Sequence, residues 1–292
     1  MDASALAVFV EAASAGSLAG AARRLRLEPL AASRALAALE RQVGVRLMQR
    51  STRSLSLTAE GEQFLPHARA LLEAESAALA SVNQQPDQAT GLLRVTSSAA
   101  FGRKLLVPFI TRFMRRHPAL KVDVLMSDRV VDLIDEGLDL AIRLARLQDS
   151  SLIARRLGDS PRVLVASPDY LAGREPPRAI EDLERHDCVL ATGQTHWQLR
   201  AGDRLVSQRI AGRFTANTVE GIHEACVGGL GIALLSEWEV KDAIADGTMV
   251  RVPLAHAAPE PLPIWAVYPT RQLLPAKVRL FVDELQRQLA AP

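Results

Sequence analysis

The sequence has few of the residues that reactive centres, disulfide frameworks and metal sites require. Its two cysteines, Cys188 and Cys226, lie far apart and show no CxxC spacing. We expect buried thiols in a reducing compartment, with a redox switch as the alternative. The six histidines are scattered without metal-ligand spacing, and no HExxH motif occurs. We therefore expect no catalytic constellation, no metal and no cofactor.

Long hydrophobic runs are also missing. No uncharged apolar stretch approaches the roughly 18 residues that span a membrane. Glu11, Arg23 and Arg24 interrupt the early apolar residues, so the start of the chain does not resemble a signal peptide. With 48% hydrophobic and 23% charged residues the composition is that of a globular protein. These features predict a cytoplasmic protein without a membrane partner.

The sequence also lacks a phosphate-binding glycine loop, since neither GxxxxGKS nor GxxxxGKT occurs. Its one glycine cluster, Gly228-Gly229-Leu230-Gly231, follows a predicted helix and precedes a predicted strand. A nucleotide-binding glycine loop has the opposite order, after a strand and before a helix. We interpret the cluster as a tight helix-to-strand turn.

The stretch from Ser17 to Gly61 carries the most specific pattern in the chain. Ser17 can cap a first helix, and Pro29 suits the first turn of a second one. Two short helices with a tight connection predict a helix-turn-helix. Two sets of apolar residues follow the i, i+3, i+4, i+7 spacing of one helix face: Leu18, Ala21, Ala22 and Leu25, then Ala32, Ala35, Leu36 and Leu39.

The outward face of the second helix would carry slim and basic side chains. Such a face can lie in the major groove of DNA, with the start of the helix against the base edges. An ordinary solvated helix face is the alternative. The residues concerned are Leu30, Ser33, Arg34, Ala37 and Arg41.

A two-stranded ribbon is predicted from Leu47 to Thr58, because leucines and serines alternate there with the period of a half-buried strand. Arg50 and Arg53 flank its tip and are candidates to grip phosphates. Residues 1–61 hold eight arginines, no lysine and five acidic residues, which gives a net charge of +3. Arginine is the better bidentate partner for phosphate and guanine, so this wing favours DNA binding.

Together these residues resemble the winged helix-turn-helix of LysR-type transcriptional regulators. The resemblance continues through the chain and implies DNA binding by the first domain and sensing of a small molecule by the rest. The positions that match in order and spacing are Phe9, Ala13, Gly16, Ser17, Ala21, Ala22, Leu25, Ser33, Leu39, Glu40, Gly44, Leu47, Arg50, Arg53, Leu57, Thr58 and Gly61.

The chain departs from the family where Ser-Gln-Pro usually precedes the recognition helix, because Glu28-Pro29-Leu30 stands there. A proline and a leucine cannot reproduce the hydrogen bonds of that glutamine. The expected partner is double-stranded DNA with a pseudo-palindromic operator. The candidate contacts are Pro29, Leu30, Ser33, Arg34, Arg50 and Arg53.

A long helix is predicted from Thr58 to about Asn83, followed by a hinge. We interpret its heptad spacing as a dimer seam, and a helix packed on its own domain is the alternative. The family resemblance implies antiparallel pairing of linker helices and a homodimer or homotetramer. We place the DNA-binding domain at 1–61 and the linker at 62–90. The seam positions are Leu65, Ala68, Leu72, Glu75, Leu79 and Val82.

From Gly91 onward short strands and helices alternate, which predicts parallel sheets. Strands are expected at 92–95, 121–125, 138–143, 163–166, 188–190, 231–235 and 264–268, and helices at 102–116, 130–136, 219–227 and 275–289. The resemblance implies two α/β subdomains like those of periplasmic solute-binding proteins. We place them at 91–160 plus 268–292 and at 161–267. The predicted fold class is α/β, with an all-α winged helix-turn-helix, a linker helix and an effector domain at 91–292.

The resemblance places the effector between the two subdomains, where strand ends meet helix starts. Each candidate hydroxyl is more often a helix cap than a ligand contact, and Arg143 could instead pair with Asp128 or Asp139. The set favours a small polar ligand carrying a carboxylate, since aromatic residues make up only 4% of the chain. The candidates are Ser97, Ser98, Ser127, Arg143, Thr192, Asn217 and Thr218.

Two functions are compatible with these patterns. The first is a sequence-specific DNA-binding transcriptional regulator, not an enzyme, that a small-molecule effector modulates. The second is an α/β solute-binding or enzyme module with a helical N-terminal oligomerisation segment. The second needs a catalytic constellation or an export signal and leaves the wing arginines unexplained, so we favour the regulator.

Overall fold

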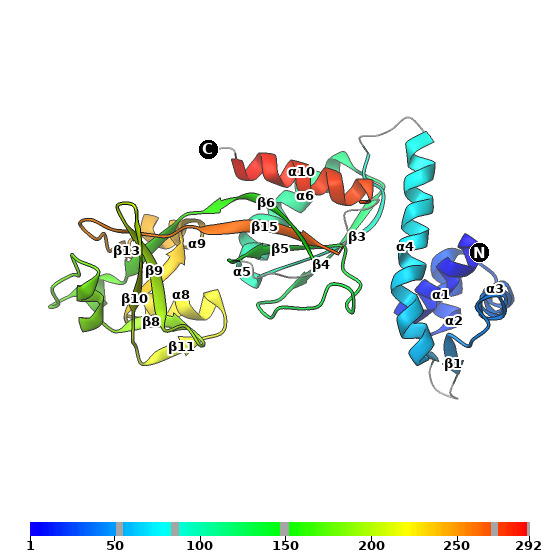
Figure 1. Cartoon of the computed structure of the whole chain (residues 1–292), viewed down its shortest axis with the longest axis horizontal. Coiled ribbons are helices and arrows are strands. Elements are labelled where there is room, and N and C mark those ends of the chain that lie inside the picture. The colour runs from blue at the N-terminus through cyan, green and yellow to red at the C-terminus, as the bar shows by residue number, and fades with distance from the viewer. Residues whose placement is uncertain (51–54, 83–87, 147–151, 270–273, 291–292) are drawn as a thin grey trace. The chain divides into compact units, whose positions relative to one another are not determined.

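The structure, a computed structural model, describes residues 1–50, 55–82, 88–146, 152–269 and 274–290 (Figure 1). Its contacts divide the chain into two compact units. One consists of Met1–Gln88, Ile134–Gly137 and Arg271–Arg279, and the other of Ala89–Leu133, Leu138–Thr270 and Leu280–Pro292. Within the described ranges, no helix combines the length and the apolar character needed to cross a membrane.

The first unit holds the helix-turn-helix and the ribbon that the sequence predicts. It contains α1 (Ala3–Ala15), α2 (Leu18–Leu25), α3 (Pro29–Val43) and α4 (Ala59–Val82). β1 (Met48–Arg50) pairs antiparallel with β2 (Leu55–Leu57). Gly44 ends α3 with a left-handed φ of 83°, a conformation that glycine adopts at little cost.

The apolar residues of α4 pack on their own domain. Ala68 is fully buried in the core of the first unit, and Leu65 and Leu72 lie partly buried against it. The dimer-seam interpretation is therefore wrong for Ala68, whereas for Leu65 and Leu72, which are only partly buried, the seam stays a prediction. Leu71, on a neighbouring side, is 45% exposed. The side chains of Leu79 and Val82 lie outside the described residues.

The first sheet of the second unit has the strand order β4-β3-β5-β15-β6. β3 runs parallel to β4 and β5, whereas β15 runs antiparallel to β5 and β6. α6 and α10 lie side by side over this sheet, where the Phe113 and Phe281 rings are 5.3 Å apart (Figure 1). The bounds are β3 (Gly91–Ser97), β4 (Leu120–Met126), β5 (Leu140–Leu144), β6 (Ile153–Ser160), β15 (Leu262–Tyr268), α5 (Ala99–Phe101), the π-helix η1 (Gly102–Leu106), α6 (Val107–Arg116) and α10 (Ala276–Ala290).

The second sheet has the strand order β11-β8-β12-β7-β13 and is buried on both faces. Side chains of α8 and α9 cover one face, and a small sheet of order β10-β9-β14 covers the other through Trp197 and Leu199. The bounds are β7 (Arg162–Ala166), β8 (Cys188–Ala191), β11 (Phe214–Ala216), β12 (Ile232–Ser236), β13 (Val250–Arg251), β9 (His196–Ala201), β10 (Arg204–Arg209), β14 (Ala258–Pro259), α7 (Pro168–Leu171), the 3-10 helix η2 (Glu181–Arg185), α8 (Val219–Val227) and α9 (Glu237–Ala245).

Three expectations about this unit are wrong. Both large sheets are mixed rather than parallel, because β15 and β7 run against their neighbours. Residues 130–136 form no helix; Val130 is 92% exposed, and a turn over 133–137 ends at Gly137 with a φ of 59°. β15 lies inside the first sheet, so Leu262–Val267 do not belong with 161–261.

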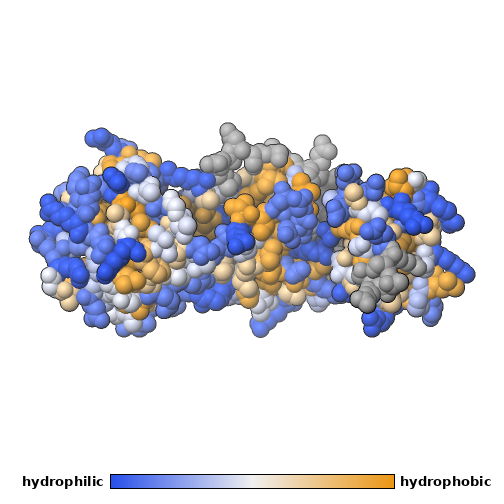
Figure 2. Space-filling model, turned by 90° about the horizontal axis from the view of Figure 1, so that it is seen from below, coloured by the Kyte–Doolittle hydropathy of each residue, from blue (hydrophilic) through white to orange (hydrophobic). Residues whose placement is uncertain are grey.

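The edge strand β4 leaves hydrophobic side chains on the surface. Leu125 is 38% exposed and Met126 45%. Figure 2 shows, on one face of the molecule, hydrophobic residues gathered in patches between hydrophilic ones. An open sheet edge with apolar side chains favours contact with another chain.

Candidate nucleic-acid interface and candidate ligand site

The connection between α2 and α3 is built from local hydrogen bonds. Ser17 caps α2, as the sequence predicts, by accepting the Gly20 N–H at 3.1 Å. Arg26 ends the helix in a left-handed conformation with a φ of 56°. The Leu27 N–H then donates to the Ala22 carbonyl at 2.9 Å. Only residues 26–28 therefore separate the two helices.

α3 presents an apolar face to the core and a polar face to solvent. Ala32, Leu36 and Leu39 are buried. Arg34 on the opposite face is exposed, as is Arg41 near the end of the helix. The outward face predicted for this helix is confirmed as solvent-accessible, and it has the dimensions to enter a major groove.

The start of α3 differs from a typical capped helix. Pro29 occupies its first turn, and Glu28 precedes it without a side-chain capping bond. Leu30 is 62% exposed and Ser33 is half-buried. Since the Glu28 side chain makes no capping bond, the N–H groups of the helix start remain available to a nucleic-acid phosphate.

Glu40 ties the wing to the end of α3. Its Oε1 accepts the N–H of Leu47 at 2.9 Å and that of Met48 at 3.1 Å. Of the two predicted wing arginines, Arg50 lies in β1 opposite Leu55, but its side chain is outside the described residues. Arg53 is outside them altogether. The phosphate contacts of these two arginines therefore stay a prediction.

Four predicted effector contacts come together at the edge where β3, β4 and β5 end. Ser97 is buried, and its hydroxyl donates to the Ser98 carbonyl at 3.1 Å. Ser127 leaves β4 and donates its N–H to the Ser97 carbonyl at 2.8 Å. Arg143 Nη1 lies 3.5 Å from the Ser127 carbonyl. The Ser98 side chain forms no capping bond, and Asp128 Oδ1 accepts the Ala99 N–H at 3.1 Å.

The Arg143 guanidinium is held in an unusual electrostatic setting. Burial lowers the pKa of Arg143, and the charge of Asp128 offsets that effect only in part. Its Nη2 is buried without a hydrogen-bond partner among the described residues. The alternative partner Asp139 uses Oδ2 to accept the Arg94 N–H at 2.7 Å. A desolvated cation with a free N–H is a ready partner for an anion.

The other three predicted contacts surround the start of α8. Thr218 Oγ1 accepts the Gly221 N–H at 3.1 Å, so Thr218 is the N-cap of this helix. Asn217 precedes it and is exposed. Thr192 follows β8, and its N–H donates to the Ala216 carbonyl at 2.9 Å. This second group lies in the other subdomain, and α8 contacts α5, which begins directly after Ser98 (Figure 1).

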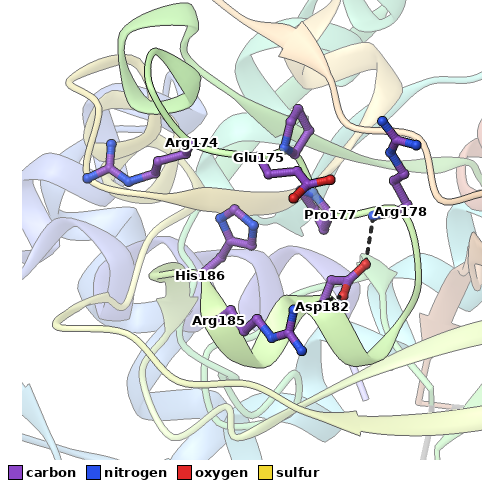
Figure 3. Close-up of a pocket in the computed structure, with 8 residues that line it drawn as sticks. Arg174, Glu175, Pro177, Arg178, Asp182, Arg185 and His186 are labelled. Atoms are coloured by element: carbon purple, nitrogen blue, oxygen red, sulfur yellow. Dashed lines mark hydrogen bonds and ion pairs between the residues drawn. The ribbon is translucent and has the colours of Figure 1, made fainter.

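A cavity of about 410 Å³ lies apart from these positions, beside η2 (Figure 3). Arg174 donates to the Tyr170 carbonyl at 2.6 Å and lies 4.6 Å from the centre of that ring. His186 Nδ1 is 3.2 Å from the Tyr170 hydroxyl. Asp182 accepts the N–H groups of Arg178 and Ala179 at 3.0 and 2.9 Å. These polar groups hold the loop's own shape, and we assign no ligand to the cavity.

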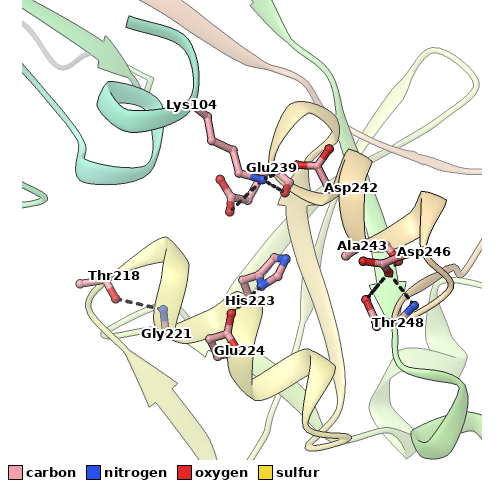
Figure 4. Close-up of polar contacts among 10 residues, drawn as sticks. All are labelled: Lys104, Thr218, Gly221, His223, Glu224, Glu239, Asp242, Ala243, Asp246 and Thr248. Carbon is pink, nitrogen blue, oxygen red and sulfur yellow. Dashed lines mark hydrogen bonds and ion pairs between the residues drawn. The ribbon is translucent and has the colours of Figure 1, made fainter. Parts of the chain in front are cut away.

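Lys104 connects the two subdomains. It projects from η1, and its Nζ donates to the Glu239 carbonyl of α9 at 2.7 Å (Figure 4). The same ammonium lies 3.8 Å from Glu239 Oε1 and 3.5 Å from Asp242 Oδ2. Phe101 adds an edge-to-face contact with Trp238, with ring centroids 5.7 Å apart. A π-helix inside an α-helical run often marks a functional position, and here it carries this inter-subdomain contact.

Glu239 is the buried partner of Lys104. It is only 2% exposed, and its Oε2 has no hydrogen-bond partner among the described residues. Burial raises the pKa of Glu239, and the charges of Lys104 and His223 oppose that rise. A cavity of about 340 Å³, lined in part by Glu239 and His223, borders the contact. The sequence does not reveal this pair, because a lysine and a glutamate 135 residues apart form no motif.

Both cysteines are buried and free, as expected. Burial raises the pKa of each thiol to about 12. They lie on opposite faces of the second sheet, since Cys188 packs with Trp197 and Cys226 with Val240. Neither is therefore a reactive thiolate at neutral pH.

Comparison with known proteins covers both units. Residues 3–62 match the family described as bacterial regulatory helix-turn-helix protein, lysR family, and residues 86–290 match the LysR substrate binding domain. The regulator CrgA of Neisseria meningitidis serogroup C is 34% identical over 286 residues, which cover 97% of this chain and 96% of CrgA. DmlR of Escherichia coli K12 is 33% identical over 289 residues, 98% of this chain and 94% of DmlR.

Two solved structures extend the comparison. The structure of CrgA from Neisseria meningitidis is 32% identical, covers 100% of both chains and has a TM-score of 0.62. The full-length structure of the Vibrio cholerae virulence activator AphB is 29% identical, covers 98% of both chains and has a TM-score of 0.58.

Proposed function

The chain belongs to the LysR family of transcriptional regulators, and from this we propose that its effector is a small carboxylate bound at Arg143. It is a DNA-binding transcriptional regulator with a helix-turn-helix domain and an effector-binding domain. A guanidinium is a fitting partner for such an effector, because its planar fork matches the geometry of a carboxylate.

The observation that carries the proposal is the state of the Arg143 side chain. The side chain is half-buried, burial lowers its pKa, and Nη2 has no partner among the described residues. A buried guanidinium N–H without a partner is costly, and a carboxylate can accept two parallel N–H bonds from a guanidinium. The Ser98 and Ser127 side chains stand at the same strand ends and would bind the remaining polar atoms of the ligand.

The second subdomain would complete the site with Thr192, Asn217 and Thr218. Thr218 already caps α8, but its hydroxyl hydrogen is still available as a donor. A ligand held by both subdomains favours the arrangement in which they are close. By linkage, it changes DNA affinity only as far as its own affinity differs between the arrangements.

For DNA, we propose that α3 enters the major groove and that β1 and β2 contact the backbone. Ser33 and Arg34 would face bases near the helix start, with Pro29 and Leu30 making apolar contacts. Arg50 and Arg53 of the wing would contact phosphates. A pseudo-palindromic operator requires a dimer, for which the exposed side of α4 with Leu71 is available. We further propose a homotetramer in the cytoplasm, without enzymatic activity.

The test of the effector site is a thermal-unfolding screen of the full chain against small mono- and dicarboxylates at constant ionic strength. At 100 times its Kd a ligand stabilises the folded protein by about 2.7 kcal/mol. We expect at least one acid to raise the unfolding temperature of the wild type, but not that of Arg143→Gln or Ser98→Ala. The control Arg185→Gln removes an equal charge from an 85% exposed side chain and should respond like the wild type. A full response in Arg143→Gln would place the effector elsewhere.

A further inference from the structure

Four arginines lie at or near strand ends of the two subdomains, and one of them, Arg162, has no ion pair within the described residues. Arg146 lies 3.8 Å and Arg200 2.8 Å from the same residue, Glu260. Asp128 is the acidic group whose charge acts on Arg143. Arg162 donates Nη2 to the Leu234 carbonyl at 3.1 Å and forms no ion pair with any described residue. Arg146 and Arg200 thus share the carboxylate of Glu260, and Asp203 also acts on Arg200, whereas Arg162 has no carboxylate partner within the described chain.

Strand pairing places Arg143 and Arg162 on facing edges of the two sheets. Arg143 lies one residue before the end of β5, at the edge where β3 and β4 also end. Arg162 begins β7 opposite Ser236, the last residue of β12. β12 runs parallel to β8, so Arg162 shares its edge with Thr192, which follows β8.

The chain itself brings these two edges together. β6, in the first sheet, ends at Ser160, and β7, in the second, begins two residues later. Ser160 pairs with Leu262 of β15. The Ala145 N–H donates to the carbonyl of Pro263, which follows Leu262, at 3.3 Å. Arg146, which follows Ala145, therefore lies near residues 160–162, where the chain passes from β6 to β7. Its charge acts on Arg162.

The electrostatics of Arg162 agree with this placement. Burial, with the repulsion of Arg146 in second place, lowers the pKa of Arg162 to about 10. A backbone carbonyl satisfies one of its N–H groups but contributes no counter-charge. A half-buried cation beside another cation is stabilised most by an anion, since partly buried pairs are screened little by salt.

We propose that the effector is a dianion, a short-chain dicarboxylate, which places one carboxylate on Arg143 and the other on Arg162. This rests on the proposed effector site and adds a second anchor on the opposite subdomain. Arg162 then determines the preference for dicarboxylates over monocarboxylates. A monocarboxylate binds Arg143 alone, whereas a dicarboxylate also gives Arg162 the carboxylate partner that it lacks and holds both subdomains.

The experiment is calorimetric titration of the full chain with oxalate, malonate, succinate, glutarate and inorganic phosphate at constant ionic strength. Acetate, propionate and butyrate serve as matched monoanions. We expect one dicarboxylate to bind the wild type at least tenfold more tightly than its monoanion. Arg162→Gln should weaken that dicarboxylate roughly 10- to 100-fold, the range of a charge-assisted hydrogen bond, and leave the monoanion unchanged. Arg162→Lys, which keeps the charge, should retain the preference for the dianion, and Arg185→Gln should behave as wild type.

The outcomes separate the two proposals. If Arg143→Gln abolishes binding but Arg162→Gln binds the dicarboxylate like the wild type, the dianion inference is wrong and the Arg143 site stands. Equal affinities of the wild type for all dianions and their monoanions would also overturn the inference, as would tightest binding of phosphate unaffected by Arg162→Gln. If both Arg143→Gln and Arg162→Gln bind every ligand like the wild type, the proposed effector site is wrong, and the dianion inference is wrong with it. Unfolding temperatures of the unliganded variants show whether each one is folded before it is titrated.

Discussion

Arg34 and Arg41 both lie on the solvent side of α3, yet we expect them to affect DNA binding differently. Arg34 is near the helix start, where recognition helices meet base edges. Arg34→Ala should weaken the free energy of binding to the specific site by roughly 1–3 kcal/mol. It should also relax the base preference at one base pair of each half-site. Arg41→Ala, at the far end, should weaken all sequences alike and flatten the salt dependence.

The measurement is a titration of each variant with a footprinted site and a scrambled duplex at several salt concentrations. Glu40→Gln is a useful third variant, because its side-chain oxygen can still accept the Leu47 N–H. It should therefore bind nearly as well as the wild type. The assignment of Arg34 to a base would be withdrawn if Arg34→Ala lost equal affinity for both duplexes.

Single residues were predictable where a local rule applies. Ser17 and Thr218 precede helices and cap them, because a hydroxyl at that position meets a free N–H two or three residues later. Arg162 and Glu239 were missed for the opposite reason. An arginine at a strand start or a glutamate in a helix has no periodic signature, and the role of Glu239 depends on a partner more than a hundred residues away.

At the scale of elements, periodicity predicted α8 (Val219–Val227) at its observed bounds, because Ile222, Ala225 and Cys226 bury one face. It failed at 130–136, where apolar residues have helical spacing but Val130 points to solvent. It also missed β9 and β10, which pair through a tight turn at Gly202 and bury Trp197. Polar residues dominate β10, so its strand character comes from pairing rather than from its own sequence.

The contact between η1 and α9 should make stability depend on pH. The raised pKa of Glu239 means that the folded state favours its protonated form. The protonated side chain therefore contributes to the stability of the folded state. This stabilisation is fully present below the ordinary pKa of a glutamate and is lost as pH rises through the raised pKa. Glu239→Gln should therefore raise the unfolding temperature at pH 8, with little change at pH 5.

Unfolding scans at intervals between pH 5 and pH 8 measure this effect. The charges acting on Glu239 come from two elements, Arg103 and Lys104 of η1 and Glu220 and His223 of α8, while Asp242 of α9 contacts Lys104. Asp242→Asn is the matched control, because Asp242 also contacts Lys104 but is 85% exposed. Equal effects of the two substitutions at every pH would refute the role of burial.

At the scale of the whole molecule, the two neighbouring leucines of α4 should behave in opposite ways. Leu72 is partly buried against the core of the first unit, so Leu72→Asp places a charge in that contact and should destabilise the unit. Leu71 is exposed and forms a row with Ala74 and Ala78, three and seven residues on. Leu71→Asp should leave helicity and unfolding temperature nearly unchanged but halve the mass.

Light scattering, together with circular dichroism, checks both variants, and Glu75→Gln serves as an exposed control on the same helix. An unchanged mass for folded Leu71→Asp would remove this side of α4 from the subunit contact. A folded, monomeric Leu72→Asp would instead support the heptad interpretation at this position.

The position of β15 has a consequence for how the chain is made. β15 lies between β5 and β6, although more than a hundred residues separate it from them in sequence. During synthesis the ribosome releases every strand of the second sheet before β15 exists. The second subdomain can fold first. Until β15 is made, β5 and β6 each have an unpaired edge, because β15 is the strand that joins them. A chain truncated before Leu262 would thus contain a folded second subdomain and a first subdomain whose sheet lacks β15. We expect such a chain to aggregate.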